Sequence, residues 1–202
     1  MPQSLKKLQT PRKHRRLRHH FIAAWVRSPL KMGALLPSSR GLARAMAQQV
    51  DMSRAGAVIE LGAGTGVVTH ALLEADIPKK NLIVIEREKP LFAILHATFH
   101  DVKILCEDAM ELTEVLENQN VKKVNAIVSS LPFLTMPSAV EQGIKEQMAK
   151  AIGDDGIIIQ FTYGHRSPFN IGEQKRYGLT GQRVKIVLLN VPPAHVWVYR
   201  RA

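Results

Sequence analysis

The stretch Glu60-Leu61-Gly62-Ala63-Gly64-Thr65-Gly66 decides the fold class of this chain. It follows the apolar run 57–59 and leads into a helix-like segment at 67–75, so the order is strand, glycine turn, helix. Glycines at alternate positions allow a sharp turn and a close approach of the backbone to a ligand, and the first amides of the helix can face the ligand's polar groups. The stretch predicts a nucleotide-binding loop or, more simply, a tight turn.

A carboxylate at the end of the next apolar run favours the binding loop. The run 82–85 ends in Glu86, twenty positions after Gly66. A second strand at that spacing places a carboxylate against the ribose hydroxyls of a nucleotide. A third predicted strand, 102–105, leads into Asp108, from which a side chain can reach an adenine edge. The glycine spacing is G-x-G-x-G, which differs from the dinucleotide pattern G-x-G-x-x-G.

Together these features resemble the class I S-adenosylmethionine-dependent methyltransferases. The resemblance implies an α/β, Rossmann-like fold with a seven-stranded sheet, mostly parallel, that ends in a C-terminal antiparallel hairpin. It implies S-adenosyl-L-methionine as cofactor and S-adenosyl-L-homocysteine as product. The cofactor-binding set that it implies surrounds the methionine and ribose, holds the ribose diol and reads the adenine: Glu60, Gly62, Ala63, Gly64, Gly66, Glu86, Arg87, Asp108, Ala109 and Ser129. Within it, Glu60 would fix the loop or the cofactor's amino group.

Length and composition predict one main domain. A chain of 202 residues with 46% hydrophobic content can bury one sizeable core. We expect a basic extension and pocket-closing loop at 1–38 and a methyltransferase domain at 39–202. No apolar stretch approaches the roughly 20 residues that span a bilayer, and no signal peptide is evident, so we expect a cytoplasmic protein. We expect a packed thiol at Cys106, and no metal site, because no ligand spacing is present.

The charge is concentrated at the N-terminus. Residues 1–50 hold eleven basic residues and no acidic one, and the remainder holds 17 of each. The stretch 12–27 predicts a helix with Leu17, Phe21 and Trp25 at four-residue spacing beneath a basic face that includes Arg15, Arg16 and Arg18. This pattern favours a helix on an anionic membrane, here the cytoplasmic face of the inner membrane. Two alternatives remain: nucleic acid attracts the same charges, and the apolar stripe could pack on the core.

The segment 28–39 is predicted to be a loop that crosses over the cofactor, ahead of a helix that Ser39 caps and that runs through Val50. Its W-x-R-x-P-x-K-x-G-A pattern, followed by P-S-S, is similar to that of the bacterial phospholipid N-methyltransferases. That resemblance implies that Lys31, Gly33, Ser38 and Ser39 help to close the cofactor pocket. The alternative is that these residues form only a cap and a linker.

The fourth predicted strand, 123–128, ends in Ser129-Ser130-Leu131-Pro132-Phe133. Ligands bind beyond the carboxyl ends of parallel strands, so these residues should meet the substrate. Methyltransferases that act on adenine or glutamine carry an Asn or Asp followed by Pro-Pro-Tyr or similar here. A serine hydroxyl lacks the paired donor and acceptor of an amide, so Ser129 and Ser130 suit an aliphatic amine better than a planar one. The alternative is that the serines satisfy strand-end backbone groups.

The fifth predicted strand, 156–162, runs into Tyr163, His165 and Arg166. The pattern Q-F-T-Y-G followed by S-P again resembles the phospholipid N-methyltransferases. Methyl transfer to an ammonium needs proton loss and then support for a new positive charge, so the Tyr163 hydroxyl and ring could serve both steps, with Phe133 as a second ring. His165 could relay the proton or, with Arg166, bind a lipid phosphate. Packing and surface roles are the alternatives.

The chain closes with two predicted strands, 183–189 and 194–200, as an antiparallel hairpin. The sequence thus favours a peripheral membrane enzyme that methylates phosphatidylethanolamine stepwise towards phosphatidylcholine. The main alternative is an RNA adenine N6-methyltransferase. Two features argue against it: the segment from Ser129 to Phe133 differs from the pattern of adenine methyltransferases, and we expect no dedicated nucleic-acid domain. A non-catalytic lipid-binding protein is the third possibility.

Overall fold

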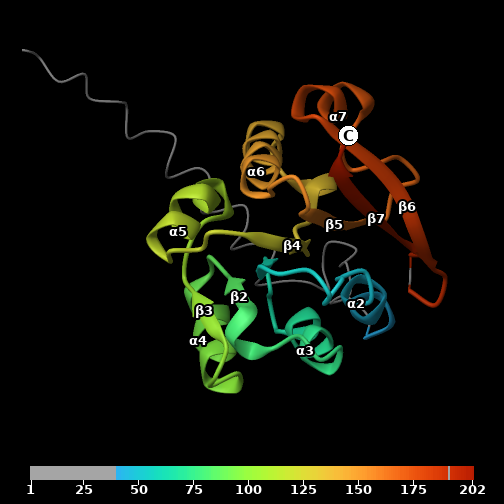
Figure 1. The fold of residues 1–202 in the computed structure, drawn as a ribbon. Helices are drawn as coiled ribbons and strands as arrows, with labels where there is room; N and C mark the ends of the chain where they lie inside the picture. Colours follow the sequence, from blue (N-terminus) through green and yellow to red (C-terminus); the bar gives the residue numbers. More distant parts are fainter. Residues whose placement is uncertain (1–39, 191) are drawn as a thin grey trace, which may run out of the picture. The chain divides into compact units, whose positions relative to one another are not determined.

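The computed structural model describes residues 40–190 and 192–202. Seven strands form one sheet, in the order β3-β2-β1-β4-β5-β7-β6 (Figure 1). The strands are β1 Ala57–Leu61, β2 Leu82–Ile85, β3 Lys103–Leu105, β4 Val124–Ser129, β5 Ile157–Thr162, β6 Leu179–Val187 and β7 Ala194–Arg201. The first five are parallel, and β7 pairs antiparallel with both β5 and β6. The predicted seven-stranded sheet with a C-terminal antiparallel hairpin is confirmed.

Helices cover both faces of this sheet. The α-helices are α2 Arg40–Ala47, α3 Val67–Glu74, α4 Lys89–Thr98, α5 Leu112–Asn118, α6 Ser138–Ala151 and α7 Ile171–Tyr177, and the short 3-10 helices are η1 Lys79–Asn81, η2 Ala109–Glu111 and η3 Phe133–Thr135. Side chains such as Val58 and Val128 pack with α2 and α3, whereas Ile59 and Ile127 pack with α5 and α6. The central strands are apolar on both faces because each face is covered. This is why the sequence shows them as continuous apolar runs.

Two predicted boundaries are corrected. Helix α2 ends at Ala47, whereas the prediction extended it to Val50, and a turn follows it. Strand β6 begins at Leu179 rather than Arg183, because Gly178 ends α7 in a left-handed conformation with φ 62° and the chain enters the strand directly. Neither boundary alters the order of the strands. None of the described helices has the length and hydrophobicity that a membrane span requires.

The topology gathers the predicted site at one edge of the sheet. The carboxyl ends of β1, β2, β4 and β5 meet there, since these strands are parallel. Strand β7 runs the other way, with His195 opposite Thr162. The turn between β6 and β7, at 188–193, therefore lies at the same edge as the glycine loop. The predictions that fall on residues 1–39 lie outside the described residues: Arg15, Arg16, Arg18, Phe21, Trp25, Lys31, Gly33, Ser38 and Ser39.

Candidate cofactor and substrate site

The glycine loop joins β1 to α3 with left-handed backbone at each glycine of the motif. Gly62, Gly64 and Gly66 have φ values of 71°, 59° and 85°. The Gly62 amide donates to the Ile85 carbonyl of β2 at 2.9 Å, and a Cβ on Gly62 would lie 2.5 Å from Leu131 Cδ2. A Cβ on Gly64 would meet nothing within 4 Å. The loop therefore has a bare backbone beside open space, as close approach of a ligand requires.

Glu86 links the end of β2 to the loop. Its side chain accepts hydrogen bonds from the Gly64 amide at 2.8 Å and the Glu88 amide at 2.9 Å. Burial raises the pKa of this carboxyl, since Glu86 is only 6% exposed. Each carboxylate oxygen keeps a further lone pair for a hydroxyl donor. The geometry is compatible with the predicted ribose contact, which remains a prediction.

Glu60 is fully buried at the end of β1 and bonds to α3. Thr69 Oγ1 donates to its Oε2 at 2.7 Å, whereas its Oε1 has no partner. Burial, and to a lesser degree the charge of Glu86, raise the pKa of Glu60 to about 8. An unpaired buried acceptor costs free energy and calls for a partner. A cationic amino group of a bound cofactor would supply that partner and favour the charged carboxylate.

Asp108 and Arg87 form a polar pair beside the same edge. Asp108 accepts from the Met110 amide at 3.0 Å and so caps η2, which begins at the buried Ala109. Arg87 Nη1 lies 3.3 Å from Asp108, and Arg87 Nη2 lies 3.3 Å from Glu88. Cys106 is half-buried, with its Sγ 3.8 Å from the Arg87 carbonyl. The structure thus places Asp108, which is predicted to contact the adenine, in the turn where it caps η2.

A row of polar side chains crosses β4, β5 and β7 near this edge. Ser129 is opposite Gln160, and Gln160 is opposite Trp197, so the three share one face of the sheet. The Gln160 amide group donates to the Leu131 carbonyl at 3.0 Å and to the Phe161 carbonyl at 2.8 Å. Both of its hydrogens are therefore used, and its Oε1 is left as an acceptor without a partner.

The unpartnered buried polar atoms of the described residues concentrate at this edge of the sheet. Six such side-chain atoms are found: Glu60 Oε1, Asn125 Oδ1, Ser130 Oγ, Gln160 Oε1, His195 Nδ1 and Trp197 Nε1. All except that of Asn125 belong to residues near the carboxyl ends of β1, β4 and β5 or to the part of β7 beside them. Buried polar groups normally have partners, so such a concentration points to a ligand or to ordered water. Gln160, His195 and Trp197 were not predicted as site residues, because a polar residue within an apolar run reads only as part of a strand.

Tyr163 and His165 follow β5 and contact the hairpin. The Tyr163 hydroxyl bonds to the Asn190 side chain, its ring lies edge-on to Phe161 at 5.3 Å, and burial raises its pKa. His165 is exposed and lies 5.3 Å, ring to ring, from His195, whose pKa is lowered by burial and by nearby Arg183. Arg166 is also exposed. These placements leave the predicted roles of Tyr163, His165 and Arg166 as predictions.

Phe133 begins the short helix η3 that follows β4. Its ring is 7% exposed and packs in the core under α6, with Lys145 Nζ 5.5 Å from the ring centroid. Lys145 is held by Glu141 and Glu173. The ring therefore already faces a fixed cation inside the core, and the predicted contact of Phe133 with the substrate stays a prediction.

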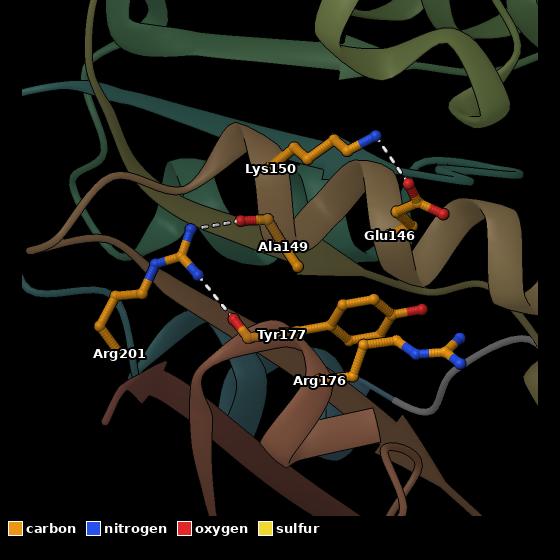
Figure 2. Close-up of a pocket in the computed structure, with 6 residues that line it drawn as sticks. All are labelled: Glu146, Ala149, Lys150, Arg176, Tyr177 and Arg201. Carbon is orange, nitrogen blue, oxygen red and sulfur yellow. Dashed lines mark hydrogen bonds and ion pairs between the residues drawn. The ribbon is translucent and has the colours of Figure 1, made fainter. Parts of the chain in front are cut away.

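A depression of about 420 Å³ lies away from this site, between α6, α7 and the end of β7 (Figure 2). Arg201 spans it, donating to the carbonyls of Tyr177, Ala149 and Ile152 at 2.6–3.0 Å. Lys150 pairs with Glu146 across its rim. These contacts fix the C-terminal strand to α6 and α7, so we interpret the depression as a packing contact between these elements and not as a ligand site. Among the described residues, no group of three or more His, Cys, Asp or Glu could hold a metal ion.

Comparison with known proteins identifies the family. Residues 38–152, more than half of the chain, match the family model described as ribosomal RNA adenine dimethylase. The chain belongs to the ribosomal RNA adenine dimethylase family. The present chain is therefore an S-adenosylmethionine-dependent N-methyltransferase. The residues around the loop fit that cofactor, since a bare backbone and the unpaired acceptor of Glu60 face the same edge.

Two curated relatives differ in substrate. The chain is 25% identical over 145 residues to an ornithine lipid N-methyltransferase of Singulisphaera acidiphila, and the match covers 70% of this chain and 76% of the relative. It is 29% identical over 128 residues to the ribosomal RNA small subunit methyltransferase A of a Hydrogenobaculum species, covering 63% of this chain. The match spans only 47% of that second relative's length. These matches thus support a family of methyltransferases that has both lipid and RNA relatives. They do not select phosphatidylethanolamine as the substrate.

Solved structures show the same fold. A 1,6-didemethyltoxoflavin-N1-methyltransferase of Burkholderia thailandensis, solved with S-adenosylhomocysteine, superimposes with a TM-score of 0.66 at 13% identity, covering 98% of this chain and 93% of that one. The glycopeptide N-methyltransferase MtfA, solved with S-adenosylmethionine, superimposes with a TM-score of 0.65 at 11% identity, and the match covers 83% of this chain and 96% of that one. At these identities the likeness establishes the Rossmann-like methyltransferase fold.

Proposed function

We propose that this protein transfers methyl groups from S-adenosylmethionine to the primary amine of a membrane lipid headgroup, with phosphatidylethanolamine as the principal substrate. The products would be the mono- and dimethyl lipids and then phosphatidylcholine. The observation that carries the proposal is the polar row of Ser129, Gln160 and Trp197 beside the Ser-Ser-Leu-Pro-Phe end of β4. It offers a fixed, unpaired acceptor to an N–H donor.

The chemistry of that acceptor suits an aliphatic amine. Gln160 cannot act as a donor, because the Leu131 and Phe161 carbonyls take both hydrogens of its amide group. An ammonium group has only hydrogens to give, so it matches an acceptor and needs no donor in return. After the ammonium loses a proton, an oriented lone pair can attack the methyl group in line, and the positional gain supplies much of the rate.

The lipid relative supports the same class of acceptor. Ornithine carries an aliphatic primary amine, as phosphatidylethanolamine does, and the match with the ornithine lipid N-methyltransferase covers most of both chains. Attachment to the cytoplasmic face of the inner membrane through a basic helix at Arg15, Arg16, Arg18, Phe21 and Trp25 is part of the proposal. So are pocket closure by Lys31, Gly33, Ser38 and Ser39 and a proton-accepting role for Tyr163 or His165.

RNA adenine methylation is the second candidate, because the family description and the ribosomal RNA relative both name that substrate. It predicts an amide or carboxylate side chain at the end of β4, where this chain has two serines. A non-catalytic lipid-binding protein is the third. It would bind the cofactor and transfer no methyl group to any lipid.

Radiolabelled methyl transfer separates the three candidates. The purified protein would be incubated with labelled cofactor and, in parallel, with vesicles of phosphatidylethanolamine, vesicles of ornithine lipid, and unmethylated small-subunit ribosomal RNA. We expect label in phosphatidylethanolamine. Label in ornithine lipid alone would show that the substrate is a different aminolipid. Label in RNA alone would establish the second candidate. Cofactor binding with no label in any of the three substrates would favour the third.

A Gln160 variant tests the acceptor itself. Gln160→Leu has similar volume but removes both the acceptor and the two donors to the Leu131 and Phe161 carbonyls. Loss of the acceptor should raise the KM for the aminolipid by about tenfold, the cost of one hydrogen bond to a charged group, and loss of the donors should lower the free energy of unfolding. Affinity for S-adenosylmethionine should not change. An unchanged KM would remove Gln160 from the substrate site, and an equal loss of cofactor affinity would indicate a folding role.

A further inference from the structure

We propose that the turn of the β6–β7 hairpin is a lipid-bilayer contact. The hairpin tip is defined here as Arg183, Val184, Lys185, Ile186, Leu188 and Leu189. It belongs to the described residues and lies far along the sequence from the basic N-terminal segment. The inference rests on the proposed function in one respect, since it explains how the site would reach an amine at a membrane surface.

The apolar side chains of the tip face solvent. Leu189 is 97% exposed and Leu188 is 73% exposed, and both lie in the turn that follows β6. Ile186 and Val184 in the strand are 41% and 36% exposed. Turns normally carry Gly, Asn, Asp, Ser or Pro, because these residues suit the backbone and tolerate water. Single exposed apolar residues need no explanation, but a run of four in six positions marks an interaction surface.

The charge around the tip is positive without compensation. Residues 174–202 contain six basic residues and no acidic one: Lys175, Arg176, Arg183, Lys185, Arg200 and Arg201. Residues 51–173 carry the opposite balance, with 11 basic and 17 acidic residues. The formally neutral domain therefore separates its charges. Arg183 and Lys185, both exposed, flank Val184 on the same strand as the exposed aliphatic side chains. Aliphatic groups between cations suit an anionic bilayer surface.

The tip lies where a lipid headgroup would have to arrive. His195 is opposite Thr162, so the turn stands at the carboxyl edge of β5. Asn190 in the turn bonds to the Tyr163 hydroxyl, and His195 lies against His165. In Figure 1 the turn is at the opposite end of β6 from α7. Insertion of Leu188 and Leu189 among lipid headgroups would therefore bring the strand ends and the polar row to the membrane surface.

Two other occupants fit less well. An RNA would use the cations but gains nothing from four aliphatic side chains, because its backbone is recognised by charge and its bases by stacking or hydrogen bonds. A second copy could pair along β6, which has no further strand beside it among the described residues. Arg183 and Lys185 of two identical strands would then face each other, and the register shift between them interrupts the edge. An anionic bilayer would contact both the cations and the aliphatic side chains of the tip.

The test is vesicle sedimentation with the full-length chain, without cofactor. Vesicles would contain phosphatidylcholine alone or with phosphatidylglycerol. Leu188→Asp/Leu189→Asp should weaken binding to the anionic vesicles at least tenfold. The matched control is Ile171→Asp at the start of α7, a residue with the same 73% exposure as Leu188, which should bind as the parent does. Arg183→Ser and Lys185→Ser should each cost about fivefold on anionic vesicles only, and Lys175→Ser should cost less.

Three outcomes would overturn the inference. Parent-like binding by Leu188→Asp/Leu189→Asp would do so, as would an equal loss in Ile171→Asp. The third is a dimer by light scattering that the double variant converts to a monomer with no change in vesicle binding. Circular dichroism and cofactor affinity should match the parent, because the substituted side chains are exposed. If the double variant loses vesicle binding while the parent methylates no lipid, the hairpin contact stands and the proposed function fails.

Discussion

Replacement of Glu60 by Gln tests the electrostatics at the centre of the cofactor site. The folded chain raises the pKa of Glu60 from 4.5 to about 8 because the carboxyl is fully buried. Between these values the unfolded chain has lost the proton and the folded chain still holds it, so the stability of the ligand-free protein falls as pH rises from about 4.5 to 8. At roughly 1.4 kcal/mol for each pH unit, the loss reaches at most about 5 kcal/mol.

Gln at this position has no ionisable proton, and its carbonyl can still accept from Thr69 Oγ1. We therefore expect Glu60→Gln to be more stable than the parent at pH 8.5 by about 2–4 kcal/mol and similar to it near pH 5. Urea unfolding of the ligand-free protein at several pH values measures this. Glu146→Gln is the control, because Glu146 is exposed and its pKa is lowered by Lys150 rather than raised. Parallel pH curves for the parent and Glu60→Gln would refute the reasoning.

The same carboxyl links cofactor affinity to pH. The ammonium and sulfonium groups of S-adenosylmethionine favour the charged form of Glu60, so binding should release a proton and tighten as pH rises towards 8. Calorimetric titration of the parent at pH 6, 7 and 8 should show this trend. Glu60→Gln should bind more weakly at pH 8 and show a flat profile. A flat profile in the parent would exclude Glu60 as the partner of a cofactor cation.

Three further predictions concern the supports of the site. Glu86→Ala removes the acceptor of the Gly64 and Glu88 amides and should weaken cofactor binding at least tenfold by calorimetry; normal affinity would remove Glu86 from the site. Gly62→Ala forces a left-handed alanine and should lower stability by about 1–2 kcal/mol in urea, whereas Gly153→Ala, where a Cβ meets nothing within 4 Å, should not. Tyr199→Phe removes the hydroxyl that bonds to Ser167 and the Phe169 amide and should cost about 1–3 kcal/mol; an unchanged urea midpoint would contradict that account.

Much of the fold was predictable because its strongest signals are local. Buried parallel strands appear as continuous apolar runs, and the glycine loop shows the strand-to-helix turn directly. Helix α7 was missed although it carries a signal, the capping box between Asn170 and Glu173. The early start of β6 depends on Gly178, which reads equally well as the middle of a loop. The structure thus corrects boundaries and confirms the mostly parallel sheet with its C-terminal antiparallel hairpin.

The site was only partly predictable, since several contacts join residues that are far apart in the chain. Glu60 and Glu86 could be placed from their spacing to the glycines. Gln160 could not, because its role depends on the carbonyl of Leu131, 29 positions earlier. The position of Lys145 over the Phe133 ring could not be predicted either, because nothing near Phe133 in the sequence shows it. The exposure of Leu188 and Leu189 likewise becomes visible only when the hairpin is built.

The most direct test of the proposed reaction follows the methyl group into the lipid itself. The protein would be incubated with S-adenosylmethionine that carries a deuterated methyl group and with mixed vesicles of phosphatidylethanolamine and an anionic lipid, in the presence of an equal mass of ribosomal RNA. Mass spectrometry would then examine both the headgroups and the nucleosides. The account predicts deuterated methyl groups on the ethanolamine nitrogen and none on adenine. Deuterium on adenine with unlabelled lipid would contradict it.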